Sequence, residues 1–167
     1  NKIEGAYSIV INTTNALIGI RDPHGYRPLC LGKTEHGYVL ASETCALDVI
    51  KAEFIRHIEP GEMVIINDEG VRSRIYAPVE KIEKKLCVFE YIYFARSDSN
   101  IDGQSVYETR LNMGRELARE TKYDADIVMS IPDSGTTAAL GYARESGIPF
   151  AEGLIKNRYS GRTFIKP

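Results

Sequence analysis

The sequence has no tryptophan, only three cysteines among 167 residues, and no marked excess of charge of either sign. An odd number of cysteines cannot pair completely, and Cys30, Cys45 and Cys87 lie in separate segments, so a disulfide-stabilised secreted scaffold is not expected. A formal net charge of -2 provides no basic field for nucleic acid. No apolar run approaches the roughly 18 residues of a membrane span, and no secretory signal precedes Asn1. These absences favour a soluble cytoplasmic protein that binds neither nucleic acid nor membrane.

The sequence does contain enough apolar material for a core, since 43% of its residues are hydrophobic and 26% are charged. Short β-type runs alternate with turns in the first half, and Asn67–Gly70 has the composition of a hairpin turn. We expect an antiparallel meander, together with a helix over about 43–51 that Ser42 caps. The runs expected to form strands are 6–11, 16–20, 29–31, 38–40, 62–66 and 71–76.

The second half of the chain differs in character, and the polar residues 78–85 are interpreted as a linker between two domains. The aromatic run 87–96 is expected to be a strand that packs in a core or an interface, because its side chains are large. Ser105 and Glu108 form a capping box for a helix that continues to about Glu120. The strand, helix and strand that follow have the order of a parallel βαβ unit.

Residues 127–137, Ile-Val-Met-Ser-Ile-Pro-Asp-Ser-Gly-Thr-Thr, join an apolar run to a loop of small hydroxyl residues. Pro132 ends the strand, and residues 134–137 offer hydroxyls and unpaired backbone N–H groups at the start of a helix expected over 136–146. Such a loop at a strand end suits an anion. The alternative is that Asp133 or Ser134 simply caps the helix.

Two stretches of the first half, residues 21–29 and 41–43, together resemble a known pair of motifs. Residues 21–29 read Arg-Asp-Pro-His-Gly-Tyr-Arg-Pro-Leu, and residues 41–43 read Ala-Ser-Glu. Alone, the first stretch could be an ordinary rigid turn with a surface salt bridge. Together they resemble the glutaminase domains of glutamine amidotransferases, and asparagine synthetases carry a similar pair. The resemblance implies an N-terminal-nucleophile hydrolase fold, in which a first-residue cysteine attacks the side-chain amide of glutamine and releases ammonia.

Two further stretches narrow the resemblance to one family. Residues 89–99, Phe-Glu-Tyr-Ile-Tyr-Phe-Ala-Arg-Ser-Asp-Ser, and residues 156–165, Lys-Asn-Arg-Tyr-Ser-Gly-Arg-Thr-Phe-Ile, are similar to motifs of the amidophosphoribosyltransferases. Ser97 departs from the family, which usually has proline there. A fragment of an asparagine synthetase or a sugar amidotransferase is disfavoured, because neither family predicts the 156–165 motif. The similarity covers essentially the whole chain.

This resemblance implies a fold of the α/β and α+β classes in two domains. Residues 1–84 would be the C-terminal part of a glutaminase (glutamine amidotransferase type 2) domain with layered sheets and helices. Residues 85–167 would be the first part of a type I phosphoribosyltransferase domain, with a parallel sheet and flanking helices. The family converts phosphoribosylpyrophosphate, glutamine and water to 5-phosphoribosylamine, glutamate and pyrophosphate, the first committed step of purine synthesis. The resemblance also implies a homo-tetramer that purine nucleotides inhibit by feedback.

The family's substrate-binding residues correspond to positions in the loop at 133–136 and in the stretch 156–162 of this sequence. Ser134 aligns with a serine that helps to ligate the Mg²⁺ of the bound substrate, and a hard cation takes oxygen ligands. Cations at the start of a mobile loop would neutralise phosphate charge as pyrophosphate departs, although a solvated basic surface is the simpler alternative. Cys87 matches a ligand of the [4Fe–4S] cluster of one family branch, or it is a small buried hydrophobe. The substrate-binding set is Asp133, Ser134, Gly135, Thr136, Lys156, Arg158, Tyr159 and Arg162.

Essential groups of both reactions have no counterpart in these 167 residues. Asn1 is not a cysteine, and neither the family's Asn-Gly oxyanion loop nor its Asp-Asp phosphoribosyl loop is present. We therefore expect an internal fragment without catalytic residues, inactive as a glutaminase and as a phosphoribosyltransferase when alone. The alternative is a non-catalytic phosphate-binding or interaction module that retained the scaffold.

Overall fold

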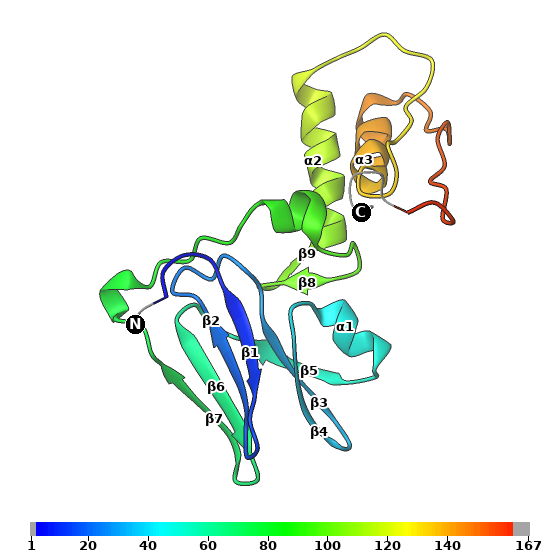
Figure 1. The fold of residues 1–167 in the computed structure, drawn as a ribbon. Helices are drawn as coiled ribbons and strands as arrows, with labels where there is room; N and C mark the ends of the chain where they lie inside the picture. The colour runs from blue at the N-terminus through cyan, green and yellow to red at the C-terminus, as the bar shows by residue number, and fades with distance from the viewer. Residues whose placement is uncertain (1–2, 162–167) are drawn as a thin grey trace. The chain divides into compact units, whose positions relative to one another are not determined.

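The chain forms two compact units, residues 1–106 and 107–167, in a computed structural model that describes residues 3–161 (Figure 1). This division comes later than the family domain boundary expected between residues 84 and 85. The intervening segment is hydrogen-bonded to the first unit, for example from the Lys85 amide to the His24 carbonyl. The domain boundary itself therefore stays a prediction. None of the helices in the described part of the chain has the length and apolarity needed to cross a bilayer.

Strands β1 to β7 of the first unit form two antiparallel sheets instead of the single meander predicted from the sequence. The strand order is β1-β2-β6-β7 in one sheet and β4-β3-β5 in the other, so the consecutive strands β2 and β3 are not partners. Strand β5 was not predicted, whereas the hairpin turn between β6 and β7 is confirmed. The strands are β1 (Ser8–Asn12), β2 (Leu17–Arg21), β3 (Cys30–Thr34), β4 (Gly37–Ala41), β5 (Glu53–His57), β6 (Glu62–Asn67) and β7 (Gly70–Ile75).

The two sheets pack on each other through side chains that alternate along their strands. Leu31 of β3 and Val64 of β6 lie in one buried cluster with Leu29 and Ile58. Cys30 points to the opposite face of β3, where it packs against Leu47 of helix α1 (Thr44–Val49). The layers of the first unit are thus sheet, sheet and helix, a mixed architecture of antiparallel sheets and helices.

Helix α1 is shorter than the predicted 43–51 helix, and its cap differs. Glu43, not Ser42, is the residue at the N-terminal boundary, and its side chain makes no capping hydrogen bond. Its carboxylate instead accepts a hydrogen bond from the amide of Arg96 at 2.8 Å. The Ser42 cap that the sequence suggested is therefore not observed, and the residue at the boundary binds a distant part of the chain.

The aromatic run 87–96 is not a strand, which corrects the sequence prediction. Residues Glu90–Phe94 form one turn of π-helix. Aromatic and β-branched residues favour strands in general, but here the amides of Glu90 and Tyr91 donate to the carbonyls of Cys87 and Val88 and begin a helical turn. A hairpin of β8 (Asn100–Ile101) and β9 (Gln104–Ser105) follows it, and a 3₁₀ turn, Val79–Lys81, precedes it.

The second unit is built on two helices, α2 (Val106–Glu120) and α3 (Thr136–Ser146). Both agree with the bounds predicted from the sequence. Gly147 ends α3 with a φ of 76°, a conformation that side chains rarely adopt. A Cβ atom at Gly114 of α2 would lie 1.9 Å from the carbonyl oxygen of Ala138 in α3. The absence of that atom allows the two helix backbones to lie in direct contact.

Candidate functional site

The loop at residues 131–135 follows a short stretch of parallel pairing in the second unit. Val128 and Phe150 form a parallel bridge. The Val128 amide donates to the Pro149 carbonyl, and the Ala151 amide donates to the Val128 carbonyl, both at 2.9 Å. The expected parallel neighbours are therefore present as a single bridge, and the loop leaves from its carboxyl end, where α/β proteins commonly bind ligands.

The backbone of the loop, and not a side chain, begins α3. Gly135 is the N-cap residue, and no side-chain capping hydrogen bond is formed, so the alternative role of Asp133 or Ser134 as a side-chain cap is not observed. The amides of Gly135 and Thr136 donate to the carbonyls of Ile131 and Asp133, each at 3.3 Å. Two of the amides expected to be unpaired are thus used within the turn, in long hydrogen bonds.

A glycine is required where this turn is tightest. A Cβ atom at Gly135 would lie 2.7 Å from the carbonyl oxygen of Ile131. The peptide bond between Pro132 and Asp133 is cis. Beside the turn, the hydroxyls of Ser130 and Thr136 lie 3.2 Å apart. The loop therefore has two neighbouring hydroxyl oxygens beside a turn that only glycine fits at residue 135.

The structure brings together the two stretches that carry the predicted substrate-binding residues. Lys156 Nζ lies 3.0 Å from Asp133 Oδ2, across 23 positions of sequence. Both side chains are more than half exposed, so the pair contributes little to stability. Its importance is its position, because it places an ammonium group beside the loop. Arg158 and Tyr159 are exposed, whereas Arg162 lies outside the described residues.

The loop carries oxygen donors of the type that Mg²⁺ takes beside phosphate and water. Among the described residues there is no group of three His, Cys, Asp or Glu side chains that could hold a metal by itself. The oxygen donors available are the Asp133 carboxylate and the hydroxyls of Ser134 and Thr136. Mg²⁺ characteristically binds through few protein oxygens and keeps substrate phosphates and water as ligands.

The described cysteines do not fit a [4Fe–4S] cluster by themselves. Such a cluster is held by four thiolates. Cys87 is a free, half-buried thiol, and the other two cysteines are free and buried. Burial raises the pKa of Cys30 to about 11, as expected for a thiol that packs as a small apolar group.

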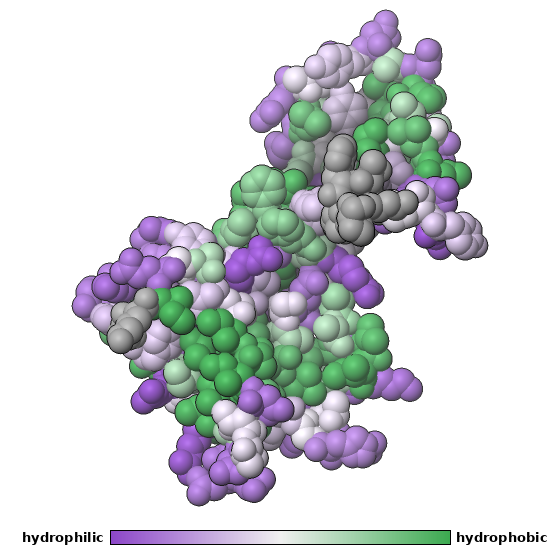
Figure 2. Space-filling model, in the orientation of Figure 1, coloured by the Kyte–Doolittle hydropathy of each residue, from purple (hydrophilic) through white to green (hydrophobic). Residues whose placement is uncertain are grey.

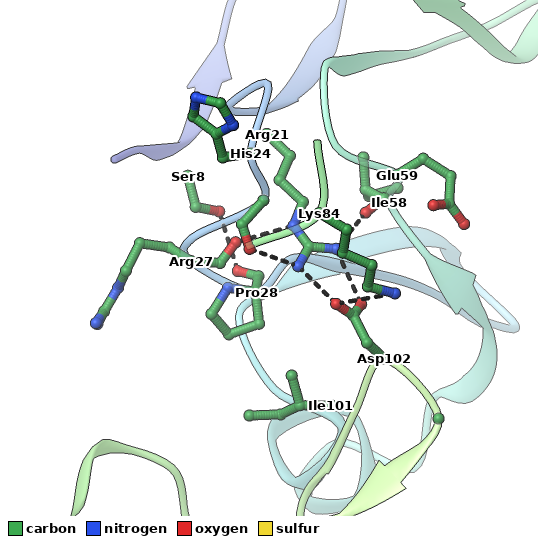
Figure 3. Close-up of polar contacts among 12 residues, drawn as sticks. Ser8, Arg21, His24, Arg27, Pro28, Ile58, Glu59, Lys84, Ile101 and Asp102 are labelled. Carbon is green, nitrogen blue, oxygen red and sulfur yellow. Dashed lines mark hydrogen bonds and ion pairs between the residues drawn. The ribbon is translucent and has the colours of Figure 1, made fainter. Parts of the chain in front are cut away.

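The Arg-Asp-Pro loop of the first unit is centred on a buried arginine (Figure 3). Arg21 is 1% exposed, and its five N–H donors make five hydrogen bonds, to the carbonyls of Gly25, Arg27 and Ile58 and to both carboxylate oxygens of Asp102. Each bond to Asp102 is 2.9 Å long. This ion pair of the loop is therefore buried, unlike the surface salt bridge considered from the sequence. Sequence reasoning missed Asp102, which lies 81 positions away and carries no motif.

Burial and the Arg21 guanidinium act in opposite directions on the Asp102 carboxyl. Burial raises its pKa, whereas hydrogen bonding and attraction from Arg21, with a smaller attraction from Lys84, outweigh burial and hold the pKa below its ordinary value. Lys84 Nζ lies 3.4 Å from Asp102 Oδ2. The carboxylate is therefore ionised at neutral pH and contacts two cations.

The Ala-Ser-Glu stretch contacts the same later segment of the chain. Glu43 Oε1 accepts hydrogen bonds from the Arg96 amide at 2.8 Å and from the Ser99 hydroxyl at 3.3 Å. The hydroxyl of Thr44 accepts a hydrogen bond from the Asn100 amide at 2.8 Å. Both motifs that resemble glutaminase domains thus make structural contacts with residues 96–102, a role that the sequence did not indicate.

Comparison with known proteins identifies close relatives, although no family model matches the chain. The chain is 55% identical over 166 residues to an amidophosphoribosyltransferase of Synechocystis and 53% identical over 164 residues to one of Archaeoglobus fulgidus. Each alignment covers 98% of this chain but only 33% and 35% of the relative.

A solved structure gives the same assignment. It is the glutamine phosphoribosylpyrophosphate amidotransferase from Bacillus subtilis, complexed with ADP and GMP, which is 52% identical with a TM-score of 0.90 over 98% of this chain and 36% of that one. The chain therefore spans about a third of the length of these relatives. Over that length the chain shares more than half of its residues with the two relatives and has the fold of the solved structure, and the chain therefore belongs to the amidophosphoribosyltransferase family.

Proposed function

We propose that this chain is part of an enzyme that converts phosphoribosylpyrophosphate, glutamine and water to 5-phosphoribosylamine, glutamate and pyrophosphate. The observation that carries the proposal is the identity of 52–55% to amidophosphoribosyltransferases over nearly the whole chain, with the fold of the Bacillus subtilis enzyme. At this level of identity the alternative of a non-catalytic module is not favoured.

The layers of the first unit support its assignment to an N-terminal-nucleophile glutaminase domain, whose expected end is residue 84. The parallel bridge and the helices α2 and α3 support the assignment of the rest to the start of a type I phosphoribosyltransferase domain. In this proposal a cysteine of the whole enzyme releases ammonia from glutamine. The ammonia nitrogen then bonds to ribose C1 as the bond from C1 to pyrophosphate breaks, the bonding electrons leave with pyrophosphate, and the new ammonium group loses a proton to solvent to give the amine.

The residues of the second unit bind and neutralise the leaving group in this proposal. The hydroxyl of Ser134 would supply an oxygen ligand to Mg²⁺, which when bound would balance the charge of the pyrophosphate, while Asp133, Gly135 and Thr136 belong to the substrate-binding loop. Lys156, already beside the loop, can exchange Asp133 for a phosphate oxygen. Arg158, Tyr159 and Arg162 belong to the loop that closes over the substrate.

The relatives also suggest how the whole protein is organised and regulated. Because the Bacillus subtilis structure contains ADP and GMP, we extend the proposal to feedback inhibition by purine nucleotides. A homo-tetramer in the cytoplasm belongs to the same proposal.

The test is an assay of the full-length natural protein. We expect glutamine-dependent formation of phosphoribosylamine that requires Mg²⁺, and separately a glutaminase activity and an ammonia-dependent synthesis. A polypeptide of only these 167 residues, prepared in parallel, is expected to show neither glutaminase activity nor synthesis of phosphoribosylamine. A full-length protein that binds phosphoribosylpyrophosphate but forms no phosphoribosylamine from either nitrogen source would favour the non-catalytic module.

A further inference from the structure

Residues 84–106, which we call the connecting segment, have a small apolar core of their own. Tyr91, Ala95, Ile101 and Val106 form a buried cluster, with Leu86 packed against it. Among the described residues, the cluster between the sheets and the cluster beneath α1 contain no member of this segment. The buried apolar residues of the segment therefore pack with one another, and polar contacts join it to the sheets.

These polar interactions begin where the segment leaves the 3₁₀ turn. The amides of Lys85 and Cys87 donate to the carbonyls of His24 and Tyr26, at 2.8 and 3.1 Å. At its far end, Glu43 and Thr44 accept the hydrogen bonds from Arg96, Ser99 and Asn100 already described. The acceptors lie on the Arg-Asp-Pro stretch in the first case, and on Glu43 of the Ala-Ser-Glu stretch and the adjacent Thr44 in the second, so the two motifs contribute most of the docking surface of the segment.

The Arg21–Asp102 pair is the most buried of these interactions. The side chains are 1% and 6% exposed. Asp102 has a φ of 49° at the turn between β8 and β9, so its carboxylate is presented by a tight turn of the segment itself. Removing one partner of a buried pair leaves the other charge desolvated and uncompensated. Loss of Asp102 would thus favour a state in which the segment opens and Arg21 is hydrated.

We propose that Arg21 and Asp102 act as a latch that positions the connecting segment, and that this position couples the two reactions of the enzyme. The coupling part of the inference rests on the proposed function. The segment joins the stretches that resemble a glutaminase to those that resemble a phosphoribosyltransferase. Arg21 and Asp102 are positioning residues in this scheme, since neither takes part in binding or chemistry at the 131–135 loop.

The latch itself is tested by hydrogen exchange of the full-length protein carrying Asp102→Asn. The asparagine keeps the shape of the side chain but removes the charge. We expect amide exchange to accelerate by about tenfold or more within residues 84–106, while the strands β1 to β7 keep wild-type rates. Asp68→Asn, the same substitution in the exposed turn between β6 and β7, is the control. Unchanged exchange in 84–106, or equal acceleration throughout the first unit, would overturn the latch.

The coupling is tested by three activities of the same variant. Glutaminase activity and ammonia-dependent synthesis are expected to stay near wild type, while glutamine-dependent synthesis falls by about fivefold or more, so that more glutamate than phosphoribosylamine is formed. Arg21→Lys, which keeps the charge but cannot make the two-point contact, should act in the same direction. Proportional loss of all three activities would show a purely structural role. If the wild-type protein lacks these activities, the proposed function fails while hydrogen exchange still decides the latch.

Discussion

Ser134 lies in a loop whose backbone, and not its side chains, begins α3. Replacing Ser134 by alanine should therefore leave the helix intact and remove one oxygen ligand from the proposed magnesium site. In the full-length protein we expect ammonia-dependent synthesis to weaken through the affinity for Mg²⁺ and phosphoribosylpyrophosphate, by about 1–3 kcal/mol. Titration of both ligands against the initial rate measures this, and glutaminase activity should change little.

The control for this prediction is Ser146→Ala, at the opposite end of the same helix. The Ser146 hydroxyl accepts a hydrogen bond from the Ile148 amide at 3.3 Å and is far along the chain from the loop. This variant should keep the wild-type dependence on both ligands. If Ser134→Ala also keeps that dependence but loses thermal stability, Ser134 has only a structural role.

Glu62 is a buried carboxylate that pairs with the partly exposed Arg56, and this pair makes the stability of the first unit depend on pH. Glu62 is 4% exposed and accepts two hydrogen bonds from Arg56, at 2.6 and 2.8 Å, and one from the Glu59 amide at 2.7 Å. Burial alone raises the pKa of Glu62. The hydrogen bonds, including one from Ser73, together outweigh burial and hold the pKa below its ordinary value.

A lowered pKa in the folded state stabilises the fold above the ordinary pKa of glutamate, about 4.3, and this stabilisation is lost as the pH falls through the folded value. Glu62→Gln should therefore reduce the free energy of unfolding by about 1–3 kcal/mol at pH 7, and by progressively less below about pH 4. Urea unfolding followed by tyrosine fluorescence measures both. Glu69→Gln in the exposed hairpin turn is the control, and a difference independent of pH would contradict the prediction.

Helices α2 and α3 pack through glycines on both sides of their contact. A Cβ atom at Gly141 would lie 2.0 Å from the carbonyl oxygen of Leu111, and the corresponding atom at Gly114 would meet the Ala138 carbonyl. Neither obstacle is a flexible side chain, so the helices would have to separate. Replacing an exposed glycine within a helix by alanine normally stabilises the helix by about 1 kcal/mol.

Gly114→Ala should have the opposite effect and destabilise the second unit by about 1–3 kcal/mol. Faster hydrogen exchange of α2 and α3, with an unchanged first unit, is the expected measurement. Asn112→Ala, an exposed position of the same helix, should have little effect or stabilise slightly. Stabilisation by Gly114→Ala would show that the two helices do not maintain this contact.

The sequence predicted best the elements that depend on local signals. Helix α3 was predicted with its observed bounds because a proline precedes it and Gly147 ends it. The hairpin at Asn67–Gly70 was predicted from turn residues. The π-helical turn at Glu90–Phe94 was mistaken for a strand, since its aromatic composition favours strands and its hydrogen bonds do not show in the sequence.

Contacts between distant residues could not be predicted in the same way. The resemblance placed Lys156 and Asp133 in one substrate-binding set but did not predict their contact, and nothing in the sequence indicated the pairing of Arg21 with Asp102. A buried ion pair forms where the fold places two charges together, and no local periodicity records this. The two sheets of the first unit illustrate the same limit, because β2 pairs with β6 across the intervening strands.

Apolar side chains remain exposed over the strands of the first unit (Figure 2). Strand β1 is an edge of its sheet among the described residues, and it exposes 49% of Val10 and 42% of Ile11. An edge strand offers unpaired N–H and C=O groups, and apolar side chains beside them favour association with a second strand. A polypeptide of these 167 residues is thus expected to self-associate through β1.

Val10→Lys should weaken this association by about tenfold, because a lysine on an edge strand opposes pairing with a second copy. Sedimentation equilibrium over a range of concentrations gives the association constant. Val79→Lys is the matched control, since Val79 is 79% exposed but lies in a 3₁₀ turn outside the sheets. Association that is equally sensitive to both substitutions would implicate general apolar contact, and a monomer at all concentrations would show that the β1 edge is not adhesive.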